Sequence, residues 1–139
     1  MKNNYYLVLS SCLFLVSVIY FICNFENNNY EILFALLLVS NVIFSILFWK
    51  KAEYKSMIHK LDGLLGKLSF TLGLLYVLLL KENCSKCRKI IFMILVIIVL
   101  ILFYLSDKFS KKSWCSRKHV IVHSIFHLFC TICTLFPFL

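Results

Sequence analysis

The chain has 139 residues, of which 62% are hydrophobic, and its mean hydropathy is +0.91. This composition is too apolar for a soluble globular domain and leaves no soluble catalytic domain of useful length, so it indicates a small polytopic membrane protein. The net charge of +9 does not indicate nucleic-acid binding, because the Lys and Arg residues lie in short segments beside apolar runs. Membrane topology and anionic lipid headgroups account for such residues.

Five apolar segments follow one another along the chain, and each is about long enough to cross the hydrocarbon core of a bilayer. We therefore predict an all-α bundle of about five transmembrane helices that forms one domain over residues 1–139. The predicted spans cover residues 4–23, 32–49, 62–80, 90–105 and 120–139. A signal peptide would also begin with a basic residue and an apolar run. The sequence Cys23-Asn24-Phe25 is a poor cleavage site, however, so the first segment is interpreted as a retained span.

The distribution of Lys and Arg predicts the orientation of an integral, multi-pass membrane protein. Eleven of these residues lie on the side that holds the N-terminus and the second and fourth loops, whereas four lie on the other side. Because basic residues are enriched in cytoplasmic loops, the N-terminus is predicted to be cytoplasmic. The sequence does not identify which membrane this is.

The fifth segment carries His119, His123 and His127 at steps of four residues, which places three imidazoles on one face of a helix. Polar side chains inside a bilayer are costly, so these histidines indicate a functional site, and two His one turn apart commonly present two nitrogens to a metal. The structural alternative is that they form hydrogen bonds between helices. Haem ligation by two His needs imidazoles on two facing helices, and only this span carries them within the bilayer.

Seven cysteines are an odd number and do not form a complete disulfide framework. Cys84 and Cys87 form a Cys-x-x-Cys motif in a basic loop, a spacing that binds metal or cycles between dithiol and disulfide. No second pair with zinc-ribbon spacing accompanies it, so the sequence leaves the role of this motif open.

Three short motifs fall on one predicted face of the membrane. They are Ser45 near the end of the second span, the Leu-Asp pair that ends at Asp62 near the start of the third, and His123 with His127 near the start of the fifth. Together they resemble the superfamily of alkaline ceramidases, progestin and adiponectin receptors, haemolysin III and Per1-like proteins. This resemblance implies a zinc ion held by three His and supported by a Ser and an Asp. In the ceramidase members, it implies hydrolysis of a lipid amide.

The chain departs from the superfamily pattern in two places. The superfamily usually has seven spans, and its third His stands four residues after the Ser, where this chain has Trp49, whose indole cannot ligate zinc. If His123 and His127 are two ligands, only His59 and His119 remain to supply the third. His119 and His127 lie about 12 Å apart along a helix, too far to share one zinc ion, so His59 is the predicted third ligand. The alternative is that His59 is a solvated loop residue and the metal site has been lost.

The resemblance therefore implies a small, ceramidase-like hydrolase of membrane lipids that uses zinc held by His59, His123 and His127. In that chemistry Asp62 acts as general base and Ser45 stabilises the developing oxyanion. Asp62 also fits the N-cap of the third helix. We further expect the fifth span to pack against the second and third, and the fourth, which has no candidate residue, to face lipid. The competing prediction is a non-catalytic structural or interaction subunit of a larger membrane complex.

Overall fold

The structure of the protein is a computed structural model that describes residues 4–25, 28–82 and 84–139. Within these ranges the chain is helical, and five helices are long and apolar enough to cross a membrane by length and composition. The predicted all-α class and the five long apolar helices are thereby confirmed. Lys2, which enters the prediction of orientation, lies outside the described residues.

The helices are α1 (Asn4–Ser11), α2 (Phe14–Cys23), α3 (Asn29–Lys51), α4 (Met57–Leu75), α5 (Lys86–Lys112) and α6 (Arg117–Leu135). A π-helical turn, η1 (Tyr76–Leu80), continues α4, and a 3-10 turn, η2 (Phe136–Phe138), continues α6. Helices α1 and α2 together form the first candidate span. The helices α3 to α6 begin before the predicted apolar segments, because the polar residues that flank these segments are also helical.

Polar side chains fix where the long helices begin. The side chain of Asn28 accepts a hydrogen bond from the backbone amide two residues on, and those of Ser56, Ser85 and Ser116 accept one from the amide three residues on. These are N-caps, which satisfy the amides that a helix leaves unpaired at its start. Since Ser56 caps α4, Asp62 lies in the second turn of that helix, and its interpretation as the N-cap is wrong.

The first span is interrupted between α1 and α2, at Cys12 and Leu13. The hydroxyls of Ser10 and Ser11 donate to the Leu7 carbonyl at 3.1 and 2.8 Å, respectively. Serine side chains that bond back to the preceding turn compete with the backbone and bend helices. The interruption therefore has a local cause, and it brings two serines to the inside of the bundle.

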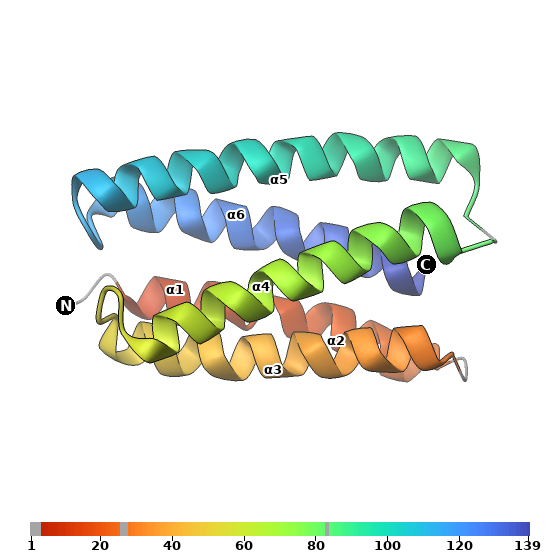
Figure 1. The fold of residues 1–139 in the computed structure, drawn as a ribbon, viewed down its shortest axis with the longest axis horizontal. Coiled ribbons are helices and arrows are strands. Elements are labelled where there is room, and N and C mark those ends of the chain that lie inside the picture. The colour runs from red at the N-terminus through yellow and green to blue at the C-terminus, as the bar shows by residue number, and fades with distance from the viewer. Residues whose placement is uncertain (1–3, 26–27, 83) are drawn as a thin grey trace.

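The helices form an arc in the order α4, α3, α1 with α2, α6 and α5. Figure 1 shows α4 running obliquely across the bundle from the α3 side toward the α5 side. Helix α6 packs most extensively against α5, where Phe92, Val96 and Val99 of α5 share one buried cluster with Cys133. The expectation that the fifth span packs against the second and third is therefore wrong. The fourth span is peripheral, as expected, because α5 stands at one end of the arc and only 22% of its apolar stretch is buried.

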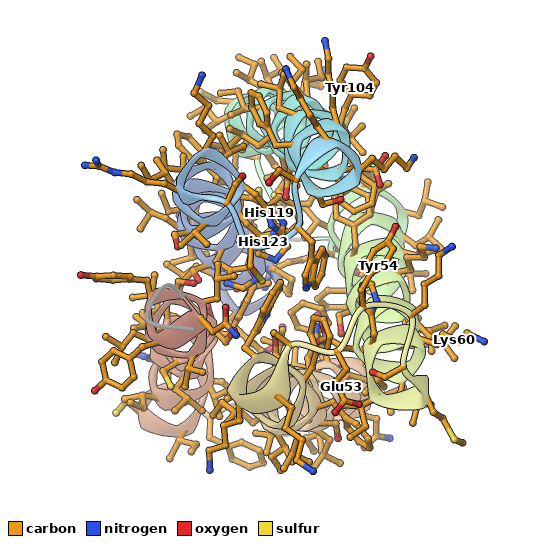
Figure 2. The ribbon with its side chains drawn as sticks, turned by 90° about the vertical axis from the view of Figure 1, so that its left-hand side faces the viewer. Glu53, Tyr54, Lys60, Tyr104, His119 and His123 are labelled. Atoms are coloured by element: carbon orange, nitrogen blue, oxygen red, sulfur yellow. The ribbon has the colours of Figure 1, made fainter. Side chains whose placement is uncertain are left out.

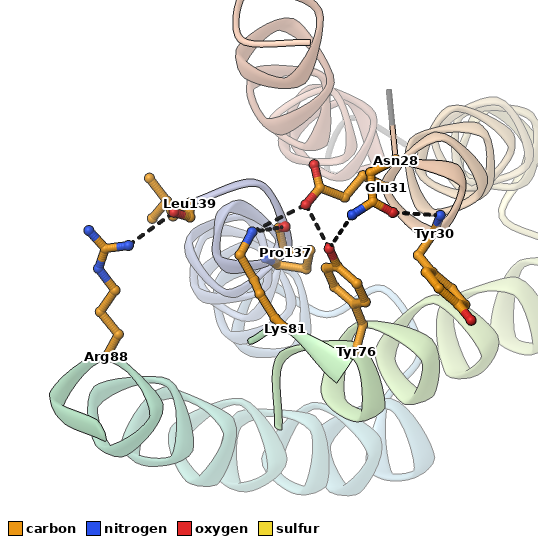
Figure 3. A network of polar contacts seen from close by, with 8 residues as sticks. All are labelled: Asn28, Tyr30, Glu31, Tyr76, Lys81, Arg88, Pro137 and Leu139. Atoms are coloured by element: carbon orange, nitrogen blue, oxygen red, sulfur yellow. Dashed lines mark hydrogen bonds and ion pairs between the residues drawn. The ribbon is translucent and has the colours of Figure 1, made fainter. Parts of the chain in front are cut away.

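The two ends of the bundle differ in character. The end that holds the N-terminus, the α3–α4 turn and the α5–α6 turn, visible in Figure 1, is called the histidine end below. At the opposite end a buried ion pair joins Lys81 Nζ and Glu31 Oε1 at 3.2 Å. The Tyr76 hydroxyl donates to the same Glu31 oxygen at 2.7 Å, and Lys81 Nζ donates to the Pro137 carbonyl at 2.6 Å (Figure 3). This Glu31–Lys81 network ties α3, the end of α4 and the end of α6 together.

Candidate functional site

A cavity of about 850 Å³ lies between α4 on one side and α3, α5 and α6 on the other. Most of its lining is apolar. Leu64 of α4 and Leu100 and Phe103 of α5 line the cavity and are 53%, 50% and 49% exposed, respectively. The cavity therefore opens sideways between α4 and α5, over a surface of the kind that faces acyl chains in a membrane.

All five predicted site residues line this cavity. Ser45 lies on α3, His59 and Asp62 on α4, and His123 and His127 on α6. These positions come together because α3 ends, and α4 and α6 begin, at the histidine end of the bundle. Figure 2, which looks onto that end, shows His123 and its neighbour His119 in the middle of the bundle.

The structure does not gather His59 into one group with His123 and His127. Among the described residues, no group of three or more His, Cys, Asp or Glu side chains is placed to hold a metal ion. The His59 ring stacks on Phe48 with centroids 4.5 Å apart, and its Nδ1 accepts the Lys55 amide at 3.0 Å. A ring nitrogen that accepts a hydrogen bond has no proton, so Nε2 of the neutral ring carries it and is not free to bind metal. His59 belongs to α4, so its description as a loop residue is wrong, and its half-buried ring packs on Phe48.

His123 and His127 lie against each other, with ring centroids 4.5 Å apart. The Nδ1 atom of His127 is 2.9 Å from Ser10 Oγ, and that of His123 is 2.7 Å from Ser106 Oγ. Since the Ser10 hydroxyl donates its hydrogen to the Leu7 carbonyl, it accepts from His127 Nδ1, and His127 Nε2 keeps a free lone pair. These contacts are the helix-to-helix hydrogen bonds of the structural alternative, and they leave the Nε2 atoms for other partners.

His119 presents a hydrogen-bond donor to the cavity, whereas His127 presents an acceptor. Its side chain is 2% exposed, and its Nδ1 accepts the backbone amide of Cys115 at 3.2 Å. The proton of the neutral ring is therefore on Nε2, which is a donor. The histidine end of the cavity thus combines a donor on His119 with an acceptor on His127.

Ser45 and Asp62 are neighbours, as the sequence predicts for the two supporting residues. The Ser11 hydroxyl of α1 is 3.1 Å from the Ser45 hydroxyl of α3, and the Asp62 carboxyl of α4 interacts with Ser45 in turn. A chain of polar groups therefore crosses from α1 through α3 to α4. It gives the Asp62 carboxyl a hydrogen-bonding partner on one side of the cavity.

Trp49 occupies the position where the superfamily has its third His. Its side chain is 2% exposed, and its ring makes an edge contact with that of His123 at a centroid distance of 5.1 Å. On its other side it stacks with Trp114, with centroids 5.7 Å apart and an interplanar angle of 17°. The indole therefore packs beside the histidine pair and, with Trp114, forms part of the cavity wall.

Sequence reasoning missed Ser10 and Ser106, which hold the two histidines. Ser106 stands at the start of a charged stretch that resembles a loop but remains helical, with an ion pair between Asp107 and Lys111 at 2.6 Å. For the first span, the spacing of polar residues in the sequence does indicate that it pairs with the fifth. Ser10 and Ser17 are seven residues apart, as are their partners His127 and Thr134, and Ser17 Oγ lies 2.8 Å from Thr134 Oγ1.

Comparison of the chain with protein-family models, with curated proteins and with solved structures finds no match. The resemblance to the ceramidase superfamily therefore rests on the short motifs around Ser45, Asp62 and His123.

Proposed function

We propose that the chain is an integral membrane protein that binds an amphipathic lipid in the cavity between α4 and α5. The observation that carries this proposal is the cavity of about 850 Å³, whose apolar, half-exposed mouth leads to a polar histidine end. Volumes of 300–1,000 Å³, lined by apolar side chains with a few polar groups, are typical of ligand sites. A lipid would enter between the two helices with its acyl chain toward the mouth and its polar part toward the histidines.

The polar groups favour a neutral linkage over a charged one. His119 offers a donor and His127 an acceptor, and an amide or a hydroxyl group supplies the matching acceptor and donor together. A carboxylate supplies only acceptors and would leave His127 Nε2 unpaired, which is unfavourable in a buried site. The lipid amide suggested by the sequence motifs fits this pattern.

Gly63→Trp tests the proposal by filling the cavity. Gly63 lines the cavity, and a Cβ atom added there meets no other atom within 4 Å, so a larger side chain enters open space. We expect the lipid retained by the detergent-washed protein to fall about fivefold or more, while the melting temperature changes little, because Gly is the weaker helix former. The measurement is quantitative mass spectrometry of lipid extracted from equal amounts of protein.

Leu68→Trp is the matched control. Leu68 is on the same helix and is 44% exposed, but it does not line the cavity. This variant is expected to retain as much lipid as the wild-type protein. Equal lipid in wild-type and Gly63→Trp protein, or equal losses in both variants, would contradict binding inside the cavity.

Zinc-dependent hydrolysis of a lipid amide is the second candidate, and the adjacent His123 and His127 rings favour it. Bound zinc would supply an activated water, with Asp62 as general base and Ser45 as a hydrogen-bond donor. The described residues do not fit a catalytic site of three protein ligands, however, because no three His, Cys, Asp or Glu side chains among them are placed to hold a metal ion. The His119 ring also contacts that of His123, but its Nε2 carries a proton, as does Nε2 of His59. Elemental analysis of the purified protein separates the two candidates.

We also propose that the histidine end faces the cytosol, which is the orientation favoured by the eleven basic residues on that side. Two cysteines at opposite ends provide the test. In variants that keep only one cysteine, Cys87 is expected to react with an impermeant maleimide on intact bacterial spheroplasts, whereas Cys115 is expected to react only after the membrane is opened.

The Cys115 reaction is also expected to depend on pH. Burial raises the pKa of the Cys115 thiol, so less of it is the reactive thiolate at neutral pH, and its labelling should accelerate as the pH rises. Labelling of Cys87 that requires an opened membrane, with Cys115 accessible from outside, would reverse the orientation.

A further inference from the structure

The turn between α5 and α6 forms a second pocket, separate from the lipid cavity and lined by basic side chains. This pocket has a volume of about 350 Å³. It is lined by Phe109, Lys112, Ser113, Ser116, Arg117 and Lys118. Three of these six side chains carry a positive charge and two carry a hydroxyl, and none carries a negative charge. We propose that this turn pocket binds a phosphate group, as carried by an acidic phospholipid headgroup.

The charges of the pocket have no counter-charge within the described residues. The ion pairs found there involve Lys81 and Lys111, not Lys112, Arg117 or Lys118. Arg117 and Lys118 also occupy the first turn of α6, which contains no acidic residue. The N-terminus of a helix carries a partial positive charge, so two cations there are unfavourably placed unless an anion lies among them.

The hydrogen-bonding groups of the pocket are those that phosphate requires. Ser116 Oγ accepts from the His119 amide as the N-cap, so its own hydrogen is free to be donated outward. The amides of Arg117 and Lys118 begin the helix, and none of the described groups accepts from them. Guanidinium and ammonium groups add charge-assisted donors for phosphate oxygens.

The backbone of the turn is held in place before any ligand binds. Trp114 Nε1 donates to the Ala52 carbonyl of the α3–α4 turn at 2.9 Å, and the Ser116 amide donates to the Ser113 carbonyl at 3.2 Å. Cys115 adopts a left-handed conformation with φ of 54°, which reverses the chain. A ligand therefore meets a turn that is already formed, which reduces the conformational entropy lost on binding.

The position of the pocket favours a lipid as the source of the phosphate. It lies at one end of two helices that are apolar enough to cross a membrane, where headgroups would lie. Basic residues next to such helices attract acidic lipids. The Ser116 cap also bonds to His119, which lines the lipid cavity, so a ligand in the turn pocket would lie against the first turn of the helix that carries the histidines.

The test compares the double variant Arg117→Gln/Lys118→Gln with Lys50→Gln/Lys51→Gln. The control removes the same charge at the same end, from exposed residues in the last turn of α3 that do not line the pocket. Native mass spectrometry of the detergent-solubilised protein measures binding of dioctanoyl phosphatidic acid, of dioctanoylglycerol, which lacks the phosphate, and of inorganic phosphate.

We expect the first variant to bind phosphatidic acid about tenfold more weakly and the control to stay within about twofold of wild type. Dioctanoylglycerol should not distinguish the variants. Inorganic phosphate that binds as tightly as the lipid would support the pocket and assign it a soluble ligand. The melting temperature without lipid should not fall in the first variant, because the lost cations sit at the helix N-terminus. Equal weakening of phosphatidic acid binding in both variants would overturn the proposal.

Discussion

Replacing Lys81 by Met is expected to lower the free energy of unfolding by about 3–5 kcal/mol, because it leaves the Glu31 carboxylate buried without its cation. The two side chains are 12% and 8% exposed, so water cannot replace the lost partner easily. The same change removes the bond from Lys81 to the Pro137 carbonyl, which fastens the end of α6 (Figure 3). The measurement is the denaturation midpoint of the purified protein in a fixed detergent.

Two controls separate a buried ion pair from a general effect of charge. The double variant Glu31→Gln/Lys81→Met removes both charges and is expected to recover much of the loss, because no unpaired ion stays buried. Lys111→Met breaks the exposed pair with Asp107 and is expected to leave the midpoint unchanged. A double variant that is no more stable than Lys81→Met alone would show that the stabilisation comes from the Pro137 bond and not from the ion pair.

Replacing Trp49 by His is expected to create a zinc site, raising the metal retained after purification to about one ion per chain. The Trp49 ring already lies 5.1 Å from the His123 ring, and the His123 and His127 rings are 4.5 Å apart, so an imidazole there joins an existing pair. Zinc needs three protein ligands to be held in an open catalytic geometry, and the substitution supplies the missing one. Elemental analysis measures the result.

The double variant Trp49→His/His123→Ala has the same loss of indole packing at position 49 but lacks one of the three imidazoles. It should therefore not retain the zinc that Trp49→His gains. The wild-type protein is analysed in the same series. One zinc per wild-type chain, lost in His123→Ala, would support the hydrolase candidate and would mean that a third ligand other than residue 49 is already present. Equal zinc in Trp49→His and in its double variant would contradict a site shared with His123.

The five candidate spans were predictable because the apolar residues form five long runs separated by charged turns, and length and hydropathy decide such cases. The meeting of Ser45, Asp62 and the histidines was also predictable. Consecutive antiparallel helices bring the end of the second span and the starts of the third and fifth to one end, whatever their order around the bundle.

The packing order was not predictable, since five apolar helices in lipid lack the one-sided hydrophobic pattern that identifies a packing face in water. Hydrogen bonds between small polar side chains join the neighbouring helices instead. Ser10 of α1 and Ser106 of α5 bond the two histidines of α6 and draw these helices together. The tautomer of His59 was not predictable either. Its Nδ1 accepts from the backbone amide of Lys55 in the preceding turn, and a backbone partner leaves no pattern in the sequence.

The position of Lys81 opposite Glu31 depends on the number of residues in the π-helical turn η1. In this turn the Lys81 amide bonds to the Tyr76 carbonyl five residues back, at 2.8 Å, so the turn contains one residue more than an α-helix would use. Deleting a single residue there would restore ordinary winding and rotate all that follows by about 100° about the axis. Lys81 would then leave Glu31. In an alignment with a homologous sequence, a one-residue gap at positions 76–80 would therefore be expected to coincide with loss of the acid at 31 or the base at 81.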